Sequence, residues 1–178
     1  MSLSEKKGTK GKNQLLEALK APERRVLLSR MTAVTMSVRD KVYDRNKKIE
    51  QIFFPLTTVL SIVSDTNDGK TAEVATVGNE GMLGLPVFFR TDTIPLRAFC
   101  QIPGEALVMT VEDFQSFTRD MNSDFSGLLY RYTQALFNQL AQPAACSSVH
   151  PIDIRCARWL LMTHDRVMRD EFPLTHEF

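Results

Sequence analysis

The sequence predicts an α+β protein: an antiparallel β jelly roll or closed barrel flanked by helices, with a long helix near the C-terminus. Residues 31–110 consist of short β-branched runs that alternate with turn residues, a texture typical of many-stranded antiparallel folds. On either side, residues 13–28 and 112–167 carry apolar side chains at spacings of three and four, which indicates amphipathic helices. The 178 residues, 43% of them hydrophobic, are enough for one domain with a real core and an appendage.

The chain begins with a polar tail and a helical segment. Residues 1–12, MSLSEKKGTKGK, hold four lysines and one leucine, which favours a disordered basic tail over a basic arm ordered on nucleic acid. Residues 13–28 read as helix, with apolar groups before and after Pro22. Because proline is tolerated in the first turn of a helix and not in its interior, Pro22 should divide this segment into two short helices.

The central region reads as a series of short antiparallel strands. The clearest hairpin lies between Ser64 and Thr71, where Asn67-Asp68-Gly69 offers the positive φ values that a tight turn needs. The predicted strands are residues 31–36, 41–44, 58–64, 71–77, 97–102 and 105–110.

Two helices are predicted next, a short one over 112–119 and a long one over 122–148. The long helix carries two adjacent apolar stripes, and Pro143 should kink or end it. One stripe can pack on the barrel, and the second favours pairing with another copy of the chain over an ordinary buried helix of a monomer. The predicted homodimer interface comprises Phe125, Leu128, Leu129, Tyr132, Leu136 and Leu140.

A last helix is predicted over 151–167, with Pro151 in its first turn. Thr175 then resembles a helix N-cap and Glu177 a first-turn residue, so the sequence stops where another helix would begin. The predicted inner face of the 151–167 helix comprises Ile154, Ala157, Leu160, Leu161 and His164.

Composition excludes several functional classes. A net charge of +1, from 22 basic and 21 acidic residues, is too balanced for the main DNA-contacting surface. Three scattered cysteines without a CxxC pair argue against structural zinc or iron–sulfur ligation and fit a reducing cytoplasm. Residues 31–110 contain no histidine, which argues against a cupin-type metal enzyme, and no catalytic arrangement stands out. No membrane span or signal peptide is apparent, so we expect a cytoplasmic protein that is not an enzyme.

Four internal stretches and the C-terminal residues carry a family resemblance. They are 51-QIFFPLTTVLSIV-63, 74-VATVGNEGMLGLPVFF-89, 102-IPGEALVM-109, 155-RCARWLLMTHDRV-167 and the terminal 174-LTHEF-178. In this order they resemble the Crp/Fnr family of bacterial transcription regulators, over nearly all residues from 13 onward.

The resemblance implies a division of labour along the chain. Residues 13–120 would form a cyclic-nucleotide-binding-like sensory barrel with flanking helices, and 121–149 a dimerisation helix. Residues 150–178 would begin a winged helix-turn-helix DNA-binding domain that is truncated here. The implied partners are a second copy, DNA through the missing domain, and RNA polymerase.

The resemblance also tests the ligand pocket residue by residue. Cyclic-nucleotide-binding members carry Gly-Glu-x-Gly-Leu, in which the glutamate accepts from the ribose, followed by an arginine for the phosphate and a small hydroxyl residue. Here Met82 replaces the glutamate, and Arg97, about one position from the expected place, is followed by Ala98. The degenerate pocket comprises Gly81, Met82, Leu83, Gly84, Leu85, Arg97, Ala98, Leu140 and Ala141, the last two standing where hydroxyls would face the base.

No cofactor is expected, and cyclic nucleotide is disfavoured, although the glycines leave a surviving phosphate cradle as the alternative. An iron–sulfur sensor needs N-terminal cysteines, and residues 1–99 contain none. The three histidines lie beyond the long helix, outside the haem-ligating positions of a sensory barrel. The leading hypothesis is therefore the sensory and dimerisation part of a Crp/Fnr-type regulator that controls DNA binding allosterically. The alternative is a stand-alone cyclic-nucleotide-binding regulatory protein.

Overall fold

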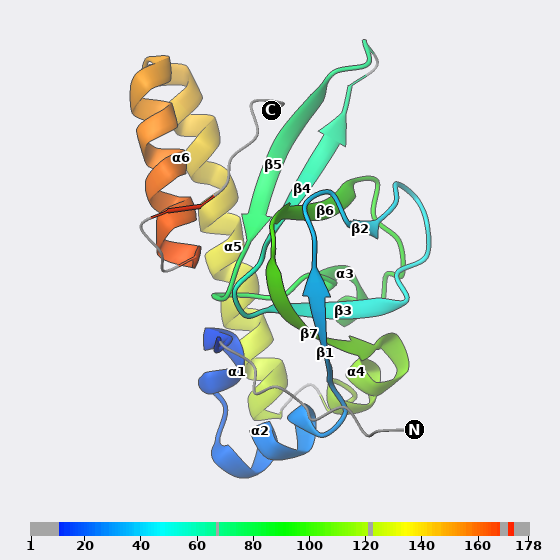
Figure 1. Ribbon diagram of the computed structural model, residues 1–178. Coiled ribbons are helices and arrows are strands. Elements are labelled where there is room, and N and C mark those ends of the chain that lie inside the picture. Colours follow the sequence, from blue (N-terminus) through cyan, green and yellow to red (C-terminus); the bar gives the residue numbers. More distant parts are fainter. Residues whose placement is uncertain (1–10, 67, 121–122, 168–170, 173–178) are drawn as a thin grey trace, which may run out of the picture.

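The computed structural model describes residues 11–66, 68–120, 123–167 and 171–172 (Figure 1). Two antiparallel sheets form the body, and a pair of long helices lies along one side of it (Figure 1). The helices are α1 (Gln14–Glu17), α2 (Ala21–Leu28), α3 (Leu85–Phe88), α4 (Val111–Phe117), α5 (Asp124–Val149) and α6 (Ile152–Val167). The strands are β1 (Thr32–Met36), β2 (Lys41–Tyr43), β3 (Gln51–Pro55), β4 (Val59–Asp65), β5 (Thr71–Val77), β6 (Arg97–Ile102) and β7 (Gly104–Thr110).

The sheets have the strand orders β1-β7-β3 and β2-β6-β4-β5, with every paired strand antiparallel. Register is fixed by pairs such as Phe53↔Val108 in the first sheet and Leu60↔Val77 in the second. The predicted fold class, an antiparallel jelly roll flanked by helices with a long helix near the C-terminus, is confirmed.

The predicted strands all form, and β5 and β6 have the predicted bounds. In the β4–β5 hairpin, Gly69 adopts a φ of 80°, as the turn requires, whereas Asn67 lies outside the described residues. Strand β3 was not predicted. Four of its five residues, Ile52–Pro55, are buried, so the strand lacks the alternation of buried and exposed residues by which a strand is recognised in a sequence.

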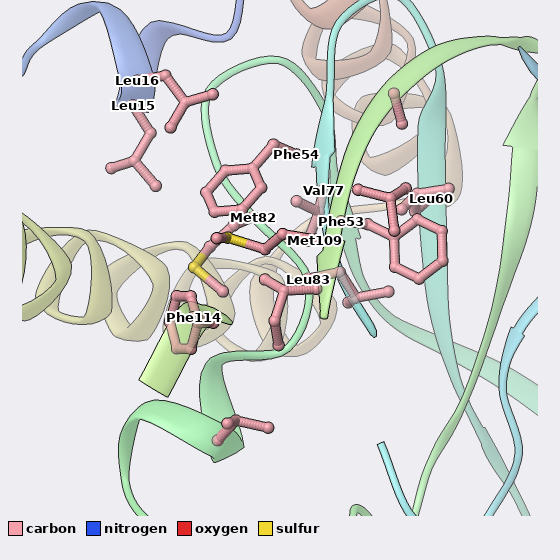
Figure 2. Close-up of a cluster of buried hydrophobic side chains, with 14 of the residues drawn as sticks. Leu15, Leu16, Phe53, Phe54, Leu60, Val77, Met82, Leu83, Met109 and Phe114 are labelled. Atoms are coloured by element: carbon pink, nitrogen blue, oxygen red, sulfur yellow. The ribbon is translucent and has the colours of Figure 1, made fainter. Parts of the chain in front are cut away.

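One hydrophobic core joins both sheets to α1, α4 and α5. Figure 2 shows its centre, where Met82, Met109 and Phe114 gather with Phe54. Phe54 and Phe114 are completely buried, and each such side chain contributes about 1.5–3 kcal/mol through removal from water. The core therefore fixes the residues after β5, which include Met82, as firmly as the strands themselves.

The N-terminal segment forms the two short helices that Pro22 predicts, with Pro22 in the first turn of α2. Buried Asn13 caps α1: its Oδ1 accepts from the Leu16 amide at 3.1 Å. Its Nδ2 donates to the carbonyls of Pro55 at 2.9 Å and Gly81 at 2.8 Å. Asn13 thus ties α1 to the barrel, whereas the predicted disordered tail lies almost wholly outside the described residues.

Helix α5 spans 26 residues, and Ser123 caps its N-terminus by accepting from the Ser126 amide. Pro143 lies inside the helix, which continues to Val149, so the expectation that proline could end it is wrong. At 1.5 Å per residue the helix is about 39 Å long. Its second half therefore runs well beyond the core that buries its first half.

The predicted dimer interface needs correction. Phe125, Leu128, Leu129 and Tyr132 are at most 8% exposed because they pack into the core of their own chain, and Leu136 and Leu140 are half-buried. The first four residues are therefore core residues rather than a free surface. The large apolar side chains that α5 does expose before Pro143 are Tyr130, at 45%, and Phe137, at 65%.

The predicted inner face of α6 is wrong. Ile154, Ala157, Leu160, Leu161 and His164 are all exposed, and Thr163, Arg166 and Val167 are the buried residues instead. The helix docks through two polar contacts with the barrel, described below, and through Val167, so most of its apolar side chains lie on the outer side. The predicted cap at Thr175 and Glu177 lies outside the described residues. No described helix is long and apolar enough to cross a membrane.

Candidate functional site

The candidate site is residues 78–84, GNEGMLG, here called the glycine-rich stretch. It connects β5 to α3 and lies where the barrel, α1, α5 and α6 meet. Its first turn is closed by the Gly81 amide, which donates to the Gly78 carbonyl at 3.2 Å. The Gly78 amide in turn donates to the Glu80 carboxylate at 3.1 Å. The stretch is thus an ordered turn whose neighbours decide what it can bind.

Two glycines of the stretch are required by close packing. A Cβ atom on Gly81 would lie 2.5 Å from Cε2 of Tyr132, on α5. Gly84 has a φ of 118°, which favours glycine, and a Cβ there would lie 2.5 Å from Cδ1 of Ile52. The space that a phosphate cradle would leave open is therefore occupied by protein side chains.

Met82 and Leu83 fill the interior beside these glycines (Figure 2). They are 1% and 4% exposed, and the Leu83 amide donates to the Phe53 carbonyl at 2.8 Å. The Phe53 amide donates to the Leu83 carbonyl at 3.0 Å. Together the two bonds form an isolated antiparallel bridge between the stretch and β3. In a nucleotide site, the backbone groups and side chains of this stretch would contact the ligand. Here they form contacts within the protein instead.

Two buried tyrosines contact the stretch. Tyr132 on α5 donates to the Met82 carbonyl at 3.0 Å, and the Tyr43 hydroxyl lies 3.2 Å from the Leu83 carbonyl. Burial raises the pKa of both phenols well above their ordinary value. Each hydroxyl therefore keeps its proton at physiological pH. Tyr132 donates this proton to the Met82 carbonyl, whereas the nearest acceptor of Tyr43 is the Gln51 carbonyl, at 2.6 Å.

Arg97, the expected phosphate partner, is committed elsewhere. Its Nε donates to Asp65 Oδ2 at 2.7 Å, and a second bond makes the pair bidentate. The Arg97 guanidinium lowers the pKa of the Asp65 carboxyl from its usual 3.8 to about 2. Arg97 and Ala98 line an open surface pocket of about 300 Å³ together with Arg39, Lys41 and Tyr43, and the glycine-rich stretch is not part of its lining.

The residues of the predicted pocket are distributed over the core, the start of α3, the open pocket and α5. Gly81, Met82, Leu83 and Gly84 lie in the core region, and Leu85 is half-buried at the start of α3. Leu140 is half-buried and Ala141 exposed on α5, one turn and more beyond Leu136. Arg97 lines the open pocket, whereas Ala98 and Tyr43 belong both to the lining of that pocket and to the hydrophobic core that contains Met82 and Leu83.

Two acidic residues that sequence reasoning missed anchor α6. Glu73 on β5 accepts from Ser61 at 2.7 Å, from Gln101 at 2.8 Å and from the Trp159 indole N–H at 2.9 Å. Glu80 accepts from Arg166 Nε at 2.7 Å. No local sequence signal marks these partners, because each of the two contacts to α6 joins residues 86 positions apart. Among the described residues, no three His, Cys, Asp or Glu side chains gather as a metal site.

Comparison with known proteins gives matches to solved structures alone. No family model matches the chain, and no curated protein matches it. The c-di-GMP-responsive global regulator CLP of Xanthomonas campestris matches 88% of this chain and 76% of its own, with 17% identity and a TM-score of 0.63. The N-terminal domain of a Streptomyces coelicolor transcriptional regulator matches 73% and 90%, with 16% identity and a TM-score of 0.55.

The catabolite activator protein of Thermus thermophilus matches 75% of this chain, with 14% identity and a TM-score of 0.55, and the match spans 60% of that protein's length. At such identities the likeness establishes the fold. The structural neighbours of this chain are Crp/Fnr-type transcription regulators and cyclic-nucleotide-binding proteins, and the chain shares the fold of their sensory domains.

Proposed function

We propose that this chain is the sensory and dimerisation part of a Crp/Fnr-type transcription regulator. In this proposal a helix-turn-helix domain that follows residue 178 binds DNA in the cytoplasm, and the part described here controls it. The observation that carries the proposal is the position of the glycine-rich stretch, which contacts α1, α5 and α6 directly. A sensory domain needs such a junction, because a ligand alters activity only by favouring one arrangement of connected elements.

The contacts at this junction are specific and short. Asn13 donates to the Gly81 carbonyl at 2.8 Å, Tyr132 to the Met82 carbonyl at 3.0 Å, and Arg166 to the Glu80 carboxylate at 2.7 Å. Each bond links one residue of the stretch to a different helix. A shift of the stretch by an ångström would break or rebuild all three, which couples the barrel to α1 and to α5 and α6, the two helices nearest the C-terminal end.

The effector, in this proposal, is not a cyclic nucleotide held in the usual way. Met82 is buried where the ribose-binding glutamate would stand, and it offers no acceptor for a hydroxyl. Arg97 would have to leave a bidentate ion pair with Asp65 before it could bind a phosphate. Both side chains of this pair are partly exposed to solvent, so Asp65 competes with a phosphate for Arg97 without excluding it.

Dimerisation is proposed along the exposed face of α5. This face carries residues spaced by four or three positions, which places them on one side of the helix, and two of them are large aromatic side chains with 45% and 65% exposure. A matching helix from a second copy would cover them in a parallel pair. The proposed contact residues are Tyr130, Gln134, Phe137, Ala141, Ala145 and Ser148.

Selection of binding sequences from a random duplex library tests the proposed function. The full-length gene product should enrich a two-fold-symmetric sequence at physiological salt, because a symmetric dimer reads two half-sites. The 1–178 chain should enrich none, since its net charge of +1 supports only weak, unspecific contact with phosphates. Specific binding by residues 1–178 alone, or no enrichment by the full-length product, would contradict the proposal.

A further inference from the structure

Helix α6 packs on α5 and the barrel with a mixed polar and apolar face inward, while most of its large apolar side chains face outward. Thr163 and Arg166 are buried, whereas Ile152, Ile154 and Leu161 are 72%, 48% and 65% exposed. An amphipathic helix in its most favourable position buries the apolar side. Hydrophobic burial is therefore a minor part of what holds α6 in this arrangement, and its one buried apolar residue, Val167, packs in a small satellite cluster with β4 and β6.

Two polar contacts anchor the helix. The Trp159 indole N–H donates to Glu73 Oε1 at 2.9 Å, and Arg166 Nε donates to Glu80 Oε1 at 2.7 Å. Seven residues separate the two donors, which places both on one side of the helix. Gly78 makes room for the second contact, because a Cβ atom there would lie 2.7 Å from Cβ of Arg166. Both acceptors belong to β5 and the glycine-rich stretch that follows it.

The docked arrangement leaves polar groups uncompensated. Gln101 Oε1 and Arg158 Nε are buried without a hydrogen-bond partner among the described residues. Gln101 already uses its Nε2 on Glu73, so its oxygen cannot be satisfied by turning the amide around. Each unpaired buried atom weakens the docked state relative to a position in which water reaches it.

We infer that α6 and the barrel form a latch with a docked and a released position. In the docked position Trp159 and Arg166 bind Glu73 and Glu80, and the apolar side of α6 faces outward. In the released position both carboxylates are solvated and α6 leaves the sheet. Because Glu80 belongs to the glycine-rich stretch, the conformation of that stretch determines whether α6 is docked or released. This inference concerns the 1–178 chain itself and stands or falls independently of DNA binding.

Hydrogen exchange of the 1–178 chain, measured by mass spectrometry, tests the latch. Glu73→Gln and Glu80→Gln each remove one charged acceptor, so amides of residues 152–167 should exchange about ten- to a hundredfold faster. Amides of β3 and β7 should keep their protection. Trp159 is the single tryptophan, so its fluorescence should also become more accessible to acrylamide in Glu73→Gln. Glu112→Gln, at an exposed position on α4, is the matched control and should change neither signal.

Two results would overturn the inference. One is unchanged exchange of α6 in both glutamate variants. The other is faster exchange of α6 only together with the barrel amides, because the helix would then belong to the same cooperative unit. Should Glu80→Gln fail to fold, Trp159→Phe decides the question by exchange, since it removes one N–H donor and leaves Glu80 with Arg166 intact.

Discussion

Substitution of Gly81 by alanine tests the close packing between the glycine-rich stretch and α5. The added Cβ would lie 2.5 Å from Cε2 of Tyr132 and closer still to its hydroxyl oxygen. The ring is 8% exposed and bonded to the Met82 carbonyl, so it cannot move aside without loss of that bond. Overpacking costs about 1–3 kcal/mol, and the lost hydrogen bond about 0.5–1.5 kcal/mol. We expect Gly81→Ala to lower the free energy of unfolding by about 2–4 kcal/mol.

Gly127→Ala is the matched control. It makes the same chemical change inside α5, the helix that the new methyl group of Gly81→Ala would meet. A Cβ on Gly127 would meet only Nη1 of Arg131, at 3.8 Å. Since Gly127 is inside α5, alanine there should stabilise the protein by up to about 1 kcal/mol. The two glycine substitutions are therefore expected to have opposite signs.

Urea unfolding followed by circular dichroism measures both effects, with the slope m used to check that the unfolded states are comparable. Tyr132→Phe removes the atom nearest the new methyl group, so the Gly81→Ala and Tyr132→Phe double variant should lose less than the sum of its single variants. A stability of Gly81→Ala within about 0.5 kcal/mol of the parent would refute the packing argument.

Three further predictions concern ligand, charge and assembly. Cyclic AMP should bind with a Kd above about 100 μM in titration calorimetry, and a micromolar isotherm abolished by Arg97→Ala would show that the phosphate cradle survives. The depressed pKa of Asp65, about 2, means that its ion pair stabilises the folded state above about pH 4 and is lost as the pH falls toward 2. Arg97→Gln should therefore flatten the acid side of the stability curve between these values, and an unchanged curve would contradict this assignment. Phe137→Glu should convert a species of about twice 20.2 kDa into a monomer in sedimentation velocity, whereas Glu112→Lys should not. A parent chain that stays monomeric at all concentrations would contradict the proposed pairing.

Strands with a clean pattern were predictable from the sequence. Strands β5 and β6 have the predicted bounds because turn residues flank β-branched or apolar runs. Strand β3 has no such contrast, since Ile52 and Phe54 are as buried as their neighbours. The local rules that reveal strands therefore fail where both faces of a strand are covered.

Helix periodicity located α5 and α6 but not their orientation. A spacing of three and four shows which residues share a side, and it does not show which side meets the barrel. For α6, Trp159 and Arg166 decide the docking, and their acceptors are distant in sequence. The glycines of the stretch similarly indicated that another part of the chain packs closely against their backbone. Only the structure shows that at Gly81 this neighbour is the Tyr132 side chain.

The cap of α1 has a consequence for biosynthesis. Helix α1 is a single turn of four residues and is too short to persist alone, so it depends on Asn13 and its bonds to Pro55 and Gly81. Gly81 follows Asn13 by 68 positions. At roughly 5–20 residues per second, the ribosome supplies that partner roughly 3–14 seconds after Asn13. During this interval Leu15, Leu16 and Leu19 have no core to enter, so the start of the nascent chain is where we expect chaperones to bind.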